Sequence, residues 1–123
     1  MYTPEEVLTT LDFLDYEQGL EYCAYSTNLY LEALNGYIGV DSRYNELIKN
    51  YEEKNWETYR VCIHAVKSSS LIIGILRLFE KAKLIEAAVK EGNFAYVSEN
   101  HPSFMKEYKD ILSKLSDALK VIG

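Results

Sequence analysis

Histidine is the residue of this chain best suited to chemistry near neutral pH, and the chain has two, His64 and His101. His64 lies in the middle of a segment with helical periodicity. Ile63 and Val66 mark the inward stripe of that segment, so His64 should point to solvent. Its neighbours on the outer helix surface are Arg60, Lys67, Ser68 and Leu71. A neutral imidazole is a nucleophile, and the two cations beside it would stabilise an attached anionic group.

The spacing of the other reactive residues does not support a different site. Helical di-metal proteins place Glu three residues before His, whereas Val61 precedes His64 and Ser98 precedes His101. Cys62 and His64 are two residues apart and would point to different sides of a helix. The chain contains no glycine-rich phosphate loop and no nucleophile elbow. We therefore expect no metal, no cofactor and no free-standing enzymatic activity.

The first half of the chain predicts a short helix and a long one. Thr3-Pro4-Glu5-Glu6 is typical of a helix start, and apolar residues follow at helical spacing as far as Leu14, before a break near 15–19. A long helix is expected from about 27 to 54, bent near Gly36 and Gly39. Four tyrosines at intervals of seven residues should pack in its core-facing seam: Tyr30, Tyr37, Tyr44 and Tyr51.

The second half predicts the helix that carries His64 and two partners for it. Asn55 is a candidate N-cap for a helix over 56–73, and Gly74 permits a tight reversal into a helix over 75–91. Gly92-Asn93 should end that helix. The apolar face of the 75–91 helix is Leu78, Ala82, Ile85 and Val89.

Pro102 determines what we expect of the last segment. Because the residue before a proline is biased away from helical dihedrals, a short turn from Phe94 should break at His101. The last helix would then run from 102 to about 121. His101 itself is expected to be a cap or a surface residue without chemistry. Since no segment alternates like a strand, residues 1–123 predict one all-α domain, an antiparallel four-helix bundle with a short extra N-terminal helix.

Composition limits the partners and the compartment. A hydrophobic content of 48% with 26% charged residues is ordinary for a globular domain, and a formal net charge of −6 argues against general nucleic-acid binding. The N-terminus does not resemble a signal peptide, and uncharged runs such as 68–76 are too short to cross a bilayer. Cys23 and Cys62 lie far apart and are expected to be reduced thiols. We expect a cytoplasmic monomer with no membrane or nucleic-acid partner.

The segment that begins at His64 resembles a known family motif. His64-Ala-Val-Lys67-Ser68-Ser69-Ser70-Leu-Ile-Ile73-Gly74 is similar to the phosphoacceptor motif of histidine phosphotransfer (HPt) domains, roughly His-x-x-Lys-Gly-Ser-Ala-x-x-Ile-Gly. The likeness covers about 15–112. It continues downstream through Gly74, Leu78, Ala82, Ile85-Glu86, Ala88 and Gly92-Asn93, and upstream through Asp15, Gly19-Leu20, Leu29-Tyr30, Leu34 and Tyr37. The chain departs from the pattern at Ser68, where the family usually has Gly, and at Ile75, where Ala is common.

The resemblance implies a phosphocarrier of two-component phosphorelays that neither binds ATP nor phosphorylates itself. His64 would accept a phosphoryl group on Nε2 from the aspartate of a response-regulator receiver domain, which can belong to a hybrid histidine kinase, and would pass it to another receiver. The receiver would supply Mg²⁺. Lys67 would face the phosphate, and Arg60, Ser68 and Leu71 would lie in the docking surface. The alternative is a module that binds a receiver or another helical partner without phosphotransfer.

Overall fold

The computed structural model describes residues 2–39 and 41–122, with the backbone alone at 41 and 42. Its helices are α1 (Pro4–Leu8), α2 (Tyr16–Tyr22), α3 (Thr27–Ile38), α4 (Asp41–Glu52), α5 (Trp56–Ile73), α6 (Leu76–Lys90) and α7 (Phe94–Lys120). The described residues contain no β-strand, and one isolated bridge joins Tyr2 to Ile122 near the two chain ends. The prediction of an all-α protein is confirmed.

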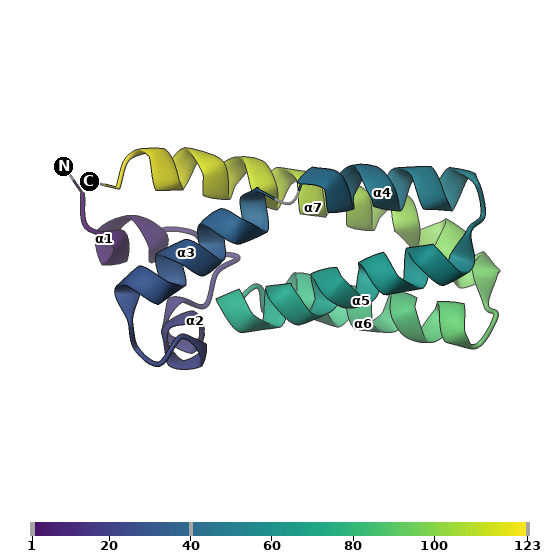
Figure 1. Ribbon diagram of the computed structural model, residues 1–123, viewed down its shortest axis with the longest axis horizontal. Coiled ribbons are helices and arrows are strands. Elements are labelled where there is room, and N and C mark those ends of the chain that lie inside the picture. The colour runs from purple at the N-terminus through teal and green to yellow at the C-terminus, as the bar shows by residue number, and fades with distance from the viewer. Residues whose placement is uncertain (1, 40, 123) are drawn as a thin grey trace.

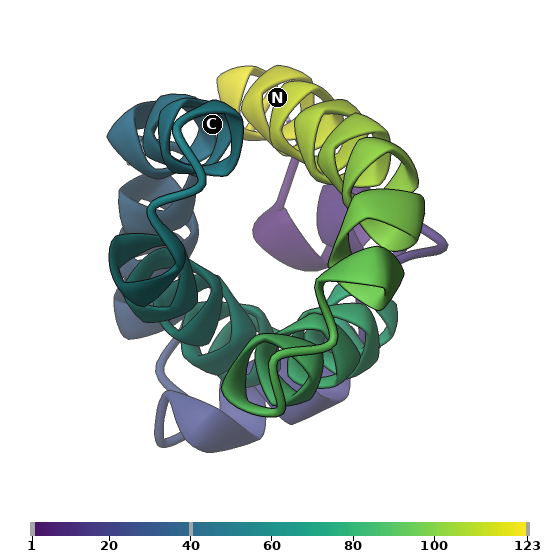
Figure 2. The same cartoon turned by 90° about the vertical axis from the view of Figure 1, so that its right-hand side faces the viewer.

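The long helices run along the molecule and surround a common apolar interior. α5 packs against α4 and α6, and α7 packs against α6, α3 and α4. Viewed end-on, α4, α5, α6 and α7 follow one another around the interior (Figure 2). The short helix α2 lies at one end, against α5 (Figure 1). The residues that fill the interior include Tyr30, Leu34, Tyr59, Ile63, Val66, Leu78, Ile85, Phe104, Tyr108 and Leu115.

The reversal between α5 and α6 depends on a glycine. Gly74 ends α5 with a φ of 92°, in the left-handed region that glycine adopts without strain. A Cβ at this position would collide with the backbone carbonyl of Asp15. The carbonyl of Gly74 in turn accepts a hydrogen bond of 2.8 Å from the Asp15 N–H, so the start of α2 is fixed to this turn. The predicted role of Gly74 is confirmed.

The N-terminal half is divided more often than predicted. The capping box of Thr3 and Glu6 is present, but α1 ends at Leu8. The break near 15–19 was placed wrongly, because the Asp15 side chain accepts a hydrogen bond from the Gln18 N–H and begins α2. The long helix expected over 27–54 is two helices, since α3 is capped at Gly39 and α4 begins at Asp41. Val40, which that helix would have included, lies outside the described residues.

The prediction for the last segment was also wrong. α7 is continuous from Phe94 to Lys120, with Pro102 inside it, although Pro102 cannot donate the helical hydrogen bond to Ser98. The reason is packing: a buried stripe at helical spacing, Val97, His101, Phe104 and Tyr108, continues on both sides of the proline. Tertiary burial therefore outweighs the local preference of the residue that precedes Pro102.

The helix that carries His64 matches its prediction closely. α5 begins after Asn55, although the Asn55 side chain makes no capping hydrogen bond. Ile63 and Val66, which mark its predicted inward stripe, are buried, together with Tyr59, Ser70 and Ile73 at helical spacing. The predicted apolar face of α6 is buried as well. Within 2–39 and 41–122, no helix combines the length and apolar character needed to cross a membrane.

Candidate functional site

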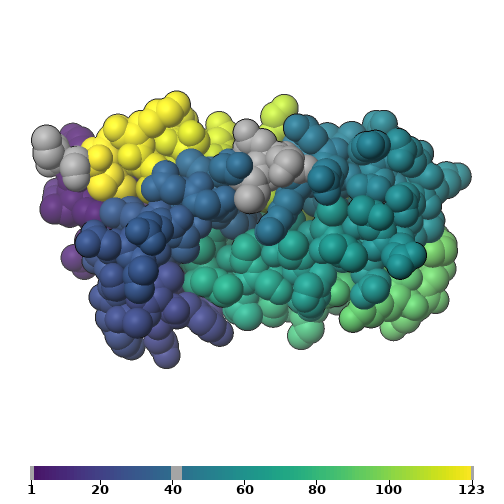
Figure 3. All heavy atoms as spheres, viewed as in Figure 1, coloured from purple at the N-terminus to yellow at the C-terminus, as the bar shows by residue number. Residues whose placement is uncertain are grey.

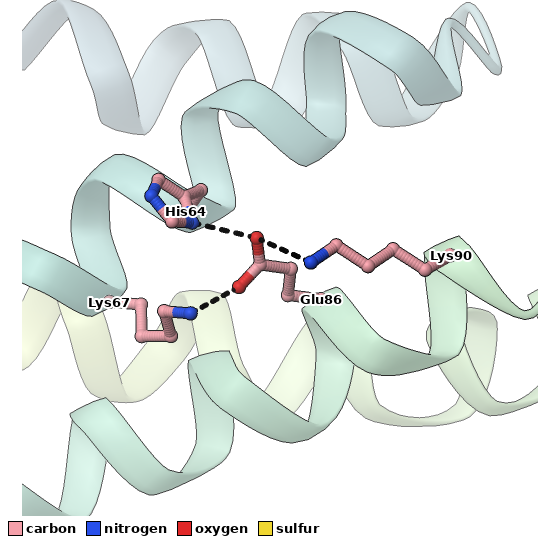
Figure 4. Close-up of polar contacts among 4 residues, drawn as sticks. All are labelled: His64, Lys67, Glu86 and Lys90. Carbon is pink, nitrogen blue, oxygen red and sulfur yellow. Dashed lines mark hydrogen bonds and ion pairs between the residues drawn. The ribbon is translucent and has the colours of Figure 1, made fainter.

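His64 lies near the middle of α5 on the surface that faces away from the interior. Its side chain is 57% exposed, while its neighbour Ile63 is fully buried. This placement agrees with the prediction that the inward stripe turns His64 to solvent. The ring is nevertheless held in place, because Nδ1 lies 2.8 Å from Oε2 of Glu86 on α6 (Figure 4).

Glu86 is the centre of the cluster. It is 3% exposed, and its second carboxylate oxygen, Oε1, lies 2.6 Å from Nζ of Lys67. Lys90, one turn further along α6, places its Nζ 3.7 Å from Oε2. One buried carboxylate thus contacts the imidazole and two lysines, and it joins α5 to α6 beside the His64 ring (Figure 4).

The electrostatics of Glu86 determine how His64 is oriented. Burial by itself raises the pKa of Glu86, but hydrogen bonds from Lys67 and His64 and the charges of these residues outweigh burial and lower the pKa. The carboxylate is therefore ionised near neutral pH and can only accept, so Nδ1 of His64 is the donor. In the neutral ring the proton then sits on Nδ1, and Nε2 carries the lone pair. Nε2 is on the side of the ring away from Glu86 (Figure 4).

The sequence predicted Lys67 as a cation beside His64, and the structure brings the two together through Glu86. Lys67 is 21% exposed and directed to the carboxylate. The other predicted site residues, Arg60, Ser68 and Leu71, are half-buried on α5. The backbone carbonyl of Leu71 accepts a hydrogen bond of 3.5 Å from the Gln18 side chain of α2. The face of α5 that carries His64 therefore extends to α2.

Two residues of the cluster, Glu86 and Lys90, were not assigned to the site by sequence reasoning. The signal for Glu86 was present: it lies on the apolar face of α6, between Ala82 and Val89 at helical spacing, and is buried with them. A carboxylate on an apolar face needs a charged partner. The residue that supplies this partner across the helix pair is Lys67.

His101 was predicted to be a cap or a surface residue, and this is wrong. It is buried, its Nδ1 lies 2.8 Å from the Tyr59 hydroxyl, and its ring stacks on Tyr51 with centroids 3.7 Å apart. Burial lowers the pKa of His101 from 6.5 to about 4, so the ring is neutral at physiological pH. His101 is a packing residue between α4, α5 and α7.

The thiols give no second candidate. Cys23 and Cys62 are free, and burial raises the pKa of Cys62 to about 11, which leaves the thiol protonated and unreactive. Among the described residues, no group of three His, Cys, Asp or Glu side chains is arranged to hold a metal ion.

No family model, curated protein or solved structure matches this chain. What the site can do is therefore argued from its own geometry: an exposed imidazole, a buried carboxylate that orients it, and two lysines on that carboxylate.

Proposed function

We propose that this protein is a histidine phosphotransfer module, an HPt-like antiparallel four-helix bundle that carries a phosphoryl group on His64 between receiver domains. The observation that carries the proposal is the bond from His64 Nδ1 to the buried Glu86 carboxylate on an otherwise exposed ring. It leaves Nε2 as the nucleophilic atom and directs it outward, to where a second protein could reach it.

The proposed transfer step uses this geometry. The Nε2 lone pair attacks the phosphorus atom of an aspartyl phosphate on the receiver, the P–O bond breaks, and its electron pair returns to the aspartate carboxylate. The phosphorylated ring keeps its proton on Nδ1 and gains positive charge, which the ionised Glu86 stabilises at 2.8 Å. Transfer to a second receiver is the reverse, with an aspartate oxygen attacking the phosphorus atom and the lone pair returning to Nε2.

Lys67 contributes to this step through two contacts, one with Glu86 and one with the phosphoryl group. Its Nζ holds Oε1 of Glu86, and it lies near the ring on α5, three residues after His64. The resemblance assigns it the contact with the phosphoryl oxygens. The receiver, by the same resemblance, contributes the Mg²⁺ that neutralises most of the charge in transfer. This chain contributes no ATP site and no autokinase activity in the proposal.

The alternative is a module that binds a receiver or another helical protein without accepting phosphate. Such a module would need the helices and their surface, but it would not need a buried glutamate bonded to an outward histidine. Keeping an ionised carboxylate 3% exposed costs desolvation free energy that a docking surface alone does not call for. The cluster therefore favours transfer over docking alone.

The test is phosphoryl transfer from receivers. Purified receiver domains of the source organism are charged with labelled acetyl phosphate and incubated with the protein. The expected label on this chain is base-stable and acid-labile, as for a phosphohistidine, and it is absent in His64→Gln. The melting temperature of His64→Gln should be nearly unchanged, because substitutions of exposed residues usually stay within about 0.5 kcal/mol. If no receiver labels the wild-type chain, or if His64→Gln takes label, the assignment is wrong.

A further inference from the structure

A groove lies on the same side of α5 as His64, two helical turns further along. It is formed where α2 crosses the end of α5 and the start of α6, and we refer to it as the α2 groove. Its apolar lining comes from Leu71, Leu76, Phe79 and Tyr22, and its carboxylates are Glu21 and Glu80. The contact between Gln18 and the Leu71 carbonyl holds α2 in this position.

The α2 groove exposes both apolar and charged side chains to solvent. The Tyr22 side chain is 53% exposed, although tyrosine is a residue that proteins usually bury at least in part. Glu21 and Glu80 are exposed, and neither forms an ion pair with any residue that the structure describes. A groove that combines apolar side chains with two carboxylates outside any ion pair is complementary to an apolar side chain with basic neighbours.

The charge of the surface changes sign between His64 and the groove. Around His64 the charged groups in contact with the site are the cations Lys67 and Lys90, while the only carboxylate of the cluster is buried. At the α2 groove the exposed charges are negative. A partner that matches both regions has an acidic centre for His64 and a basic, apolar segment beside that centre.

The distance between the two regions suits a single partner. Leu71 follows His64 by seven residues, which is about 10 Å along a helix. A standard interface buries about 800 Å² on each protein, equivalent to a disc of roughly 16 Å radius. A receiver centred on His64 would therefore reach the α2 groove.

We propose that the α2 groove is the second contact of the receiver that exchanges a phosphoryl group with His64, and that it binds an apolar side chain flanked by Lys or Arg on that receiver. The inference rests on the proposed function, because the partner is the phosphoryl donor or acceptor of His64. It assigns α2, which does not contact the reactive ring, to partner selection.

The experiment uses the receiver that labels the wild-type chain fastest. Transfer rates are measured against receiver concentration for Tyr22→Ala and for the double variant Glu21→Lys with Glu80→Lys. Each should raise KM about tenfold or more and leave kcat near the wild-type value, because the groove aids docking and not the transfer step. Phosphoramidate, a small phosphoryl donor that needs no docking surface, should label His64 at the wild-type rate in all variants.

The matched control is Glu17→Lys. Glu17 is also an exposed carboxylate of α2, but it lies against the 9–15 loop, outside the α2 groove. Its KM should equal that of the wild type. The inference is overturned if KM is unchanged in the groove variants, if Glu17→Lys raises KM equally, or if phosphoramidate labelling falls with receiver labelling. A wild-type chain that no receiver labels, by contrast, overturns the proposed function itself.

Discussion

Each of the two histidines of this chain has its Nδ1 in a hydrogen bond, but the surroundings of the two rings are opposite. Each ring has Nδ1 at 2.8 Å from an oxygen, which belongs to the Glu86 carboxylate for His64 and to the Tyr59 hydroxyl for His101. His64 is 57% exposed, and His101 is 7% exposed. An ionised carboxylate stabilises positive charge on the ring, whereas a phenol among aromatic rings does not. An anionic group therefore faces the first ring, whereas the second ring is neutral and packed among aromatic side chains.

The aromatic side chains around His101 show how this residue stabilises the fold. Tyr51 stacks on it with an interplanar angle of 4°, and Tyr59 lies at 50° to it. Trp56 packs edge-on against both tyrosines and stacks on Phe94. These rings come from α4, α5 and α7, so the aromatic cluster ties three helices together near the end of the molecule where α7 begins.

The largest effect should come from removing the buried ring. His101→Ala would leave a cavity under Tyr51 and an unpaired Tyr59 hydroxyl, and should lower the free energy of unfolding by about 3–5 kcal/mol, as for other buried rings. His101→Phe keeps the ring and should lower it less. Urea denaturation measures both. Under conditions where each variant is folded, labelling of His64 should match the wild type. A folded variant that takes no label would contradict the interpretation that His101 has only a structural role.

Acid should weaken the two regions in different pH ranges. The pKa of His101 is about 4 in the folded protein and about 6.5 when unfolded. As pH falls through this window the unfolded chain binds a proton that the folded chain does not, so stability is full above pH 6.5 and decreases to pH 4. The loss approaches about 3 kcal/mol, since one pKa unit equals 1.36 kcal/mol.

The effect of Glu86 begins at the acid end of that range and continues below it. Its lowered pKa means that its contribution is present above the ordinary carboxylate pKa of 4.5 and is lost as pH falls further. Denaturation series from pH 7.5 to 3.5 on the wild type and His101→Phe should therefore differ in slope mainly between pH 6.5 and 4: the wild type loses stability there, and the variant, which lacks the buried histidine, does not. Parallel curves over that window would show that His101 is not the group responsible.

The sequence predicted the structure correctly where the local residue pattern and the tertiary burial agree. The inward stripe of α5 and the glycine at 74 predicted that His64 faces outward and where its helix ends, and both predictions are confirmed. Helical periodicity shows which residues share a face, and in α5 the face it marks is the buried one. The all-α class followed from the same periodicity.

The sequence did not predict the structure where contacts between residues far apart in the chain determine it. Pro102 predicted a break that the burial of Val97 and Phe104 on either side prevents. His101 looked like a surface residue because the tyrosine that bonds it is 42 residues away. Glu86 was the most informative residue overlooked, since its contact with His64 spans 22 residues and appears only when α5 and α6 are paired.

A smaller effect tests the charge of Glu86 alone. Glu86→Gln retains an oxygen that can accept from His64 Nδ1 but removes the negative charge that, in the proposed step, stabilises the phosphorylated ring. Charge-assisted hydrogen bonds are roughly twice as strong as neutral ones, so transfer from a charged receiver should slow by about tenfold. Glu91→Gln, an exposed change just past the end of α6, is the control. Single-turnover rates equal in the two variants would show that the carboxylate does not assist the step.

The smallest effect concerns Ser68, the clearest departure from the HPt pattern. It lies one turn beyond His64 on the same face of α5 and is half-buried, so its side chain borders the approach to the ring. Ser69 and Ser70 direct their hydroxyls to Ala65 and Tyr37, whereas no hydrogen bond of the Ser68 hydroxyl is found among the described residues. The hydroxyl is thus available either to obstruct a receiver or to bond a phosphoryl oxygen.

Two substitutions separate these roles. If the side chain crowds the ring, Ser68→Gly should transfer faster, by less than about tenfold, and Ser68→Ala should lie between it and the wild type, with phosphohistidine lifetimes unchanged. If the hydroxyl bonds the phosphoryl group, both variants should lose the label sooner. We expect crowding, because Lys67 already supplies a stronger, charged donor beside the ring. Glycine also costs up to about 1 kcal/mol inside a helix, so rates are compared where both variants are fully folded. Equal transfer rates in all three proteins would contradict the crowding explanation.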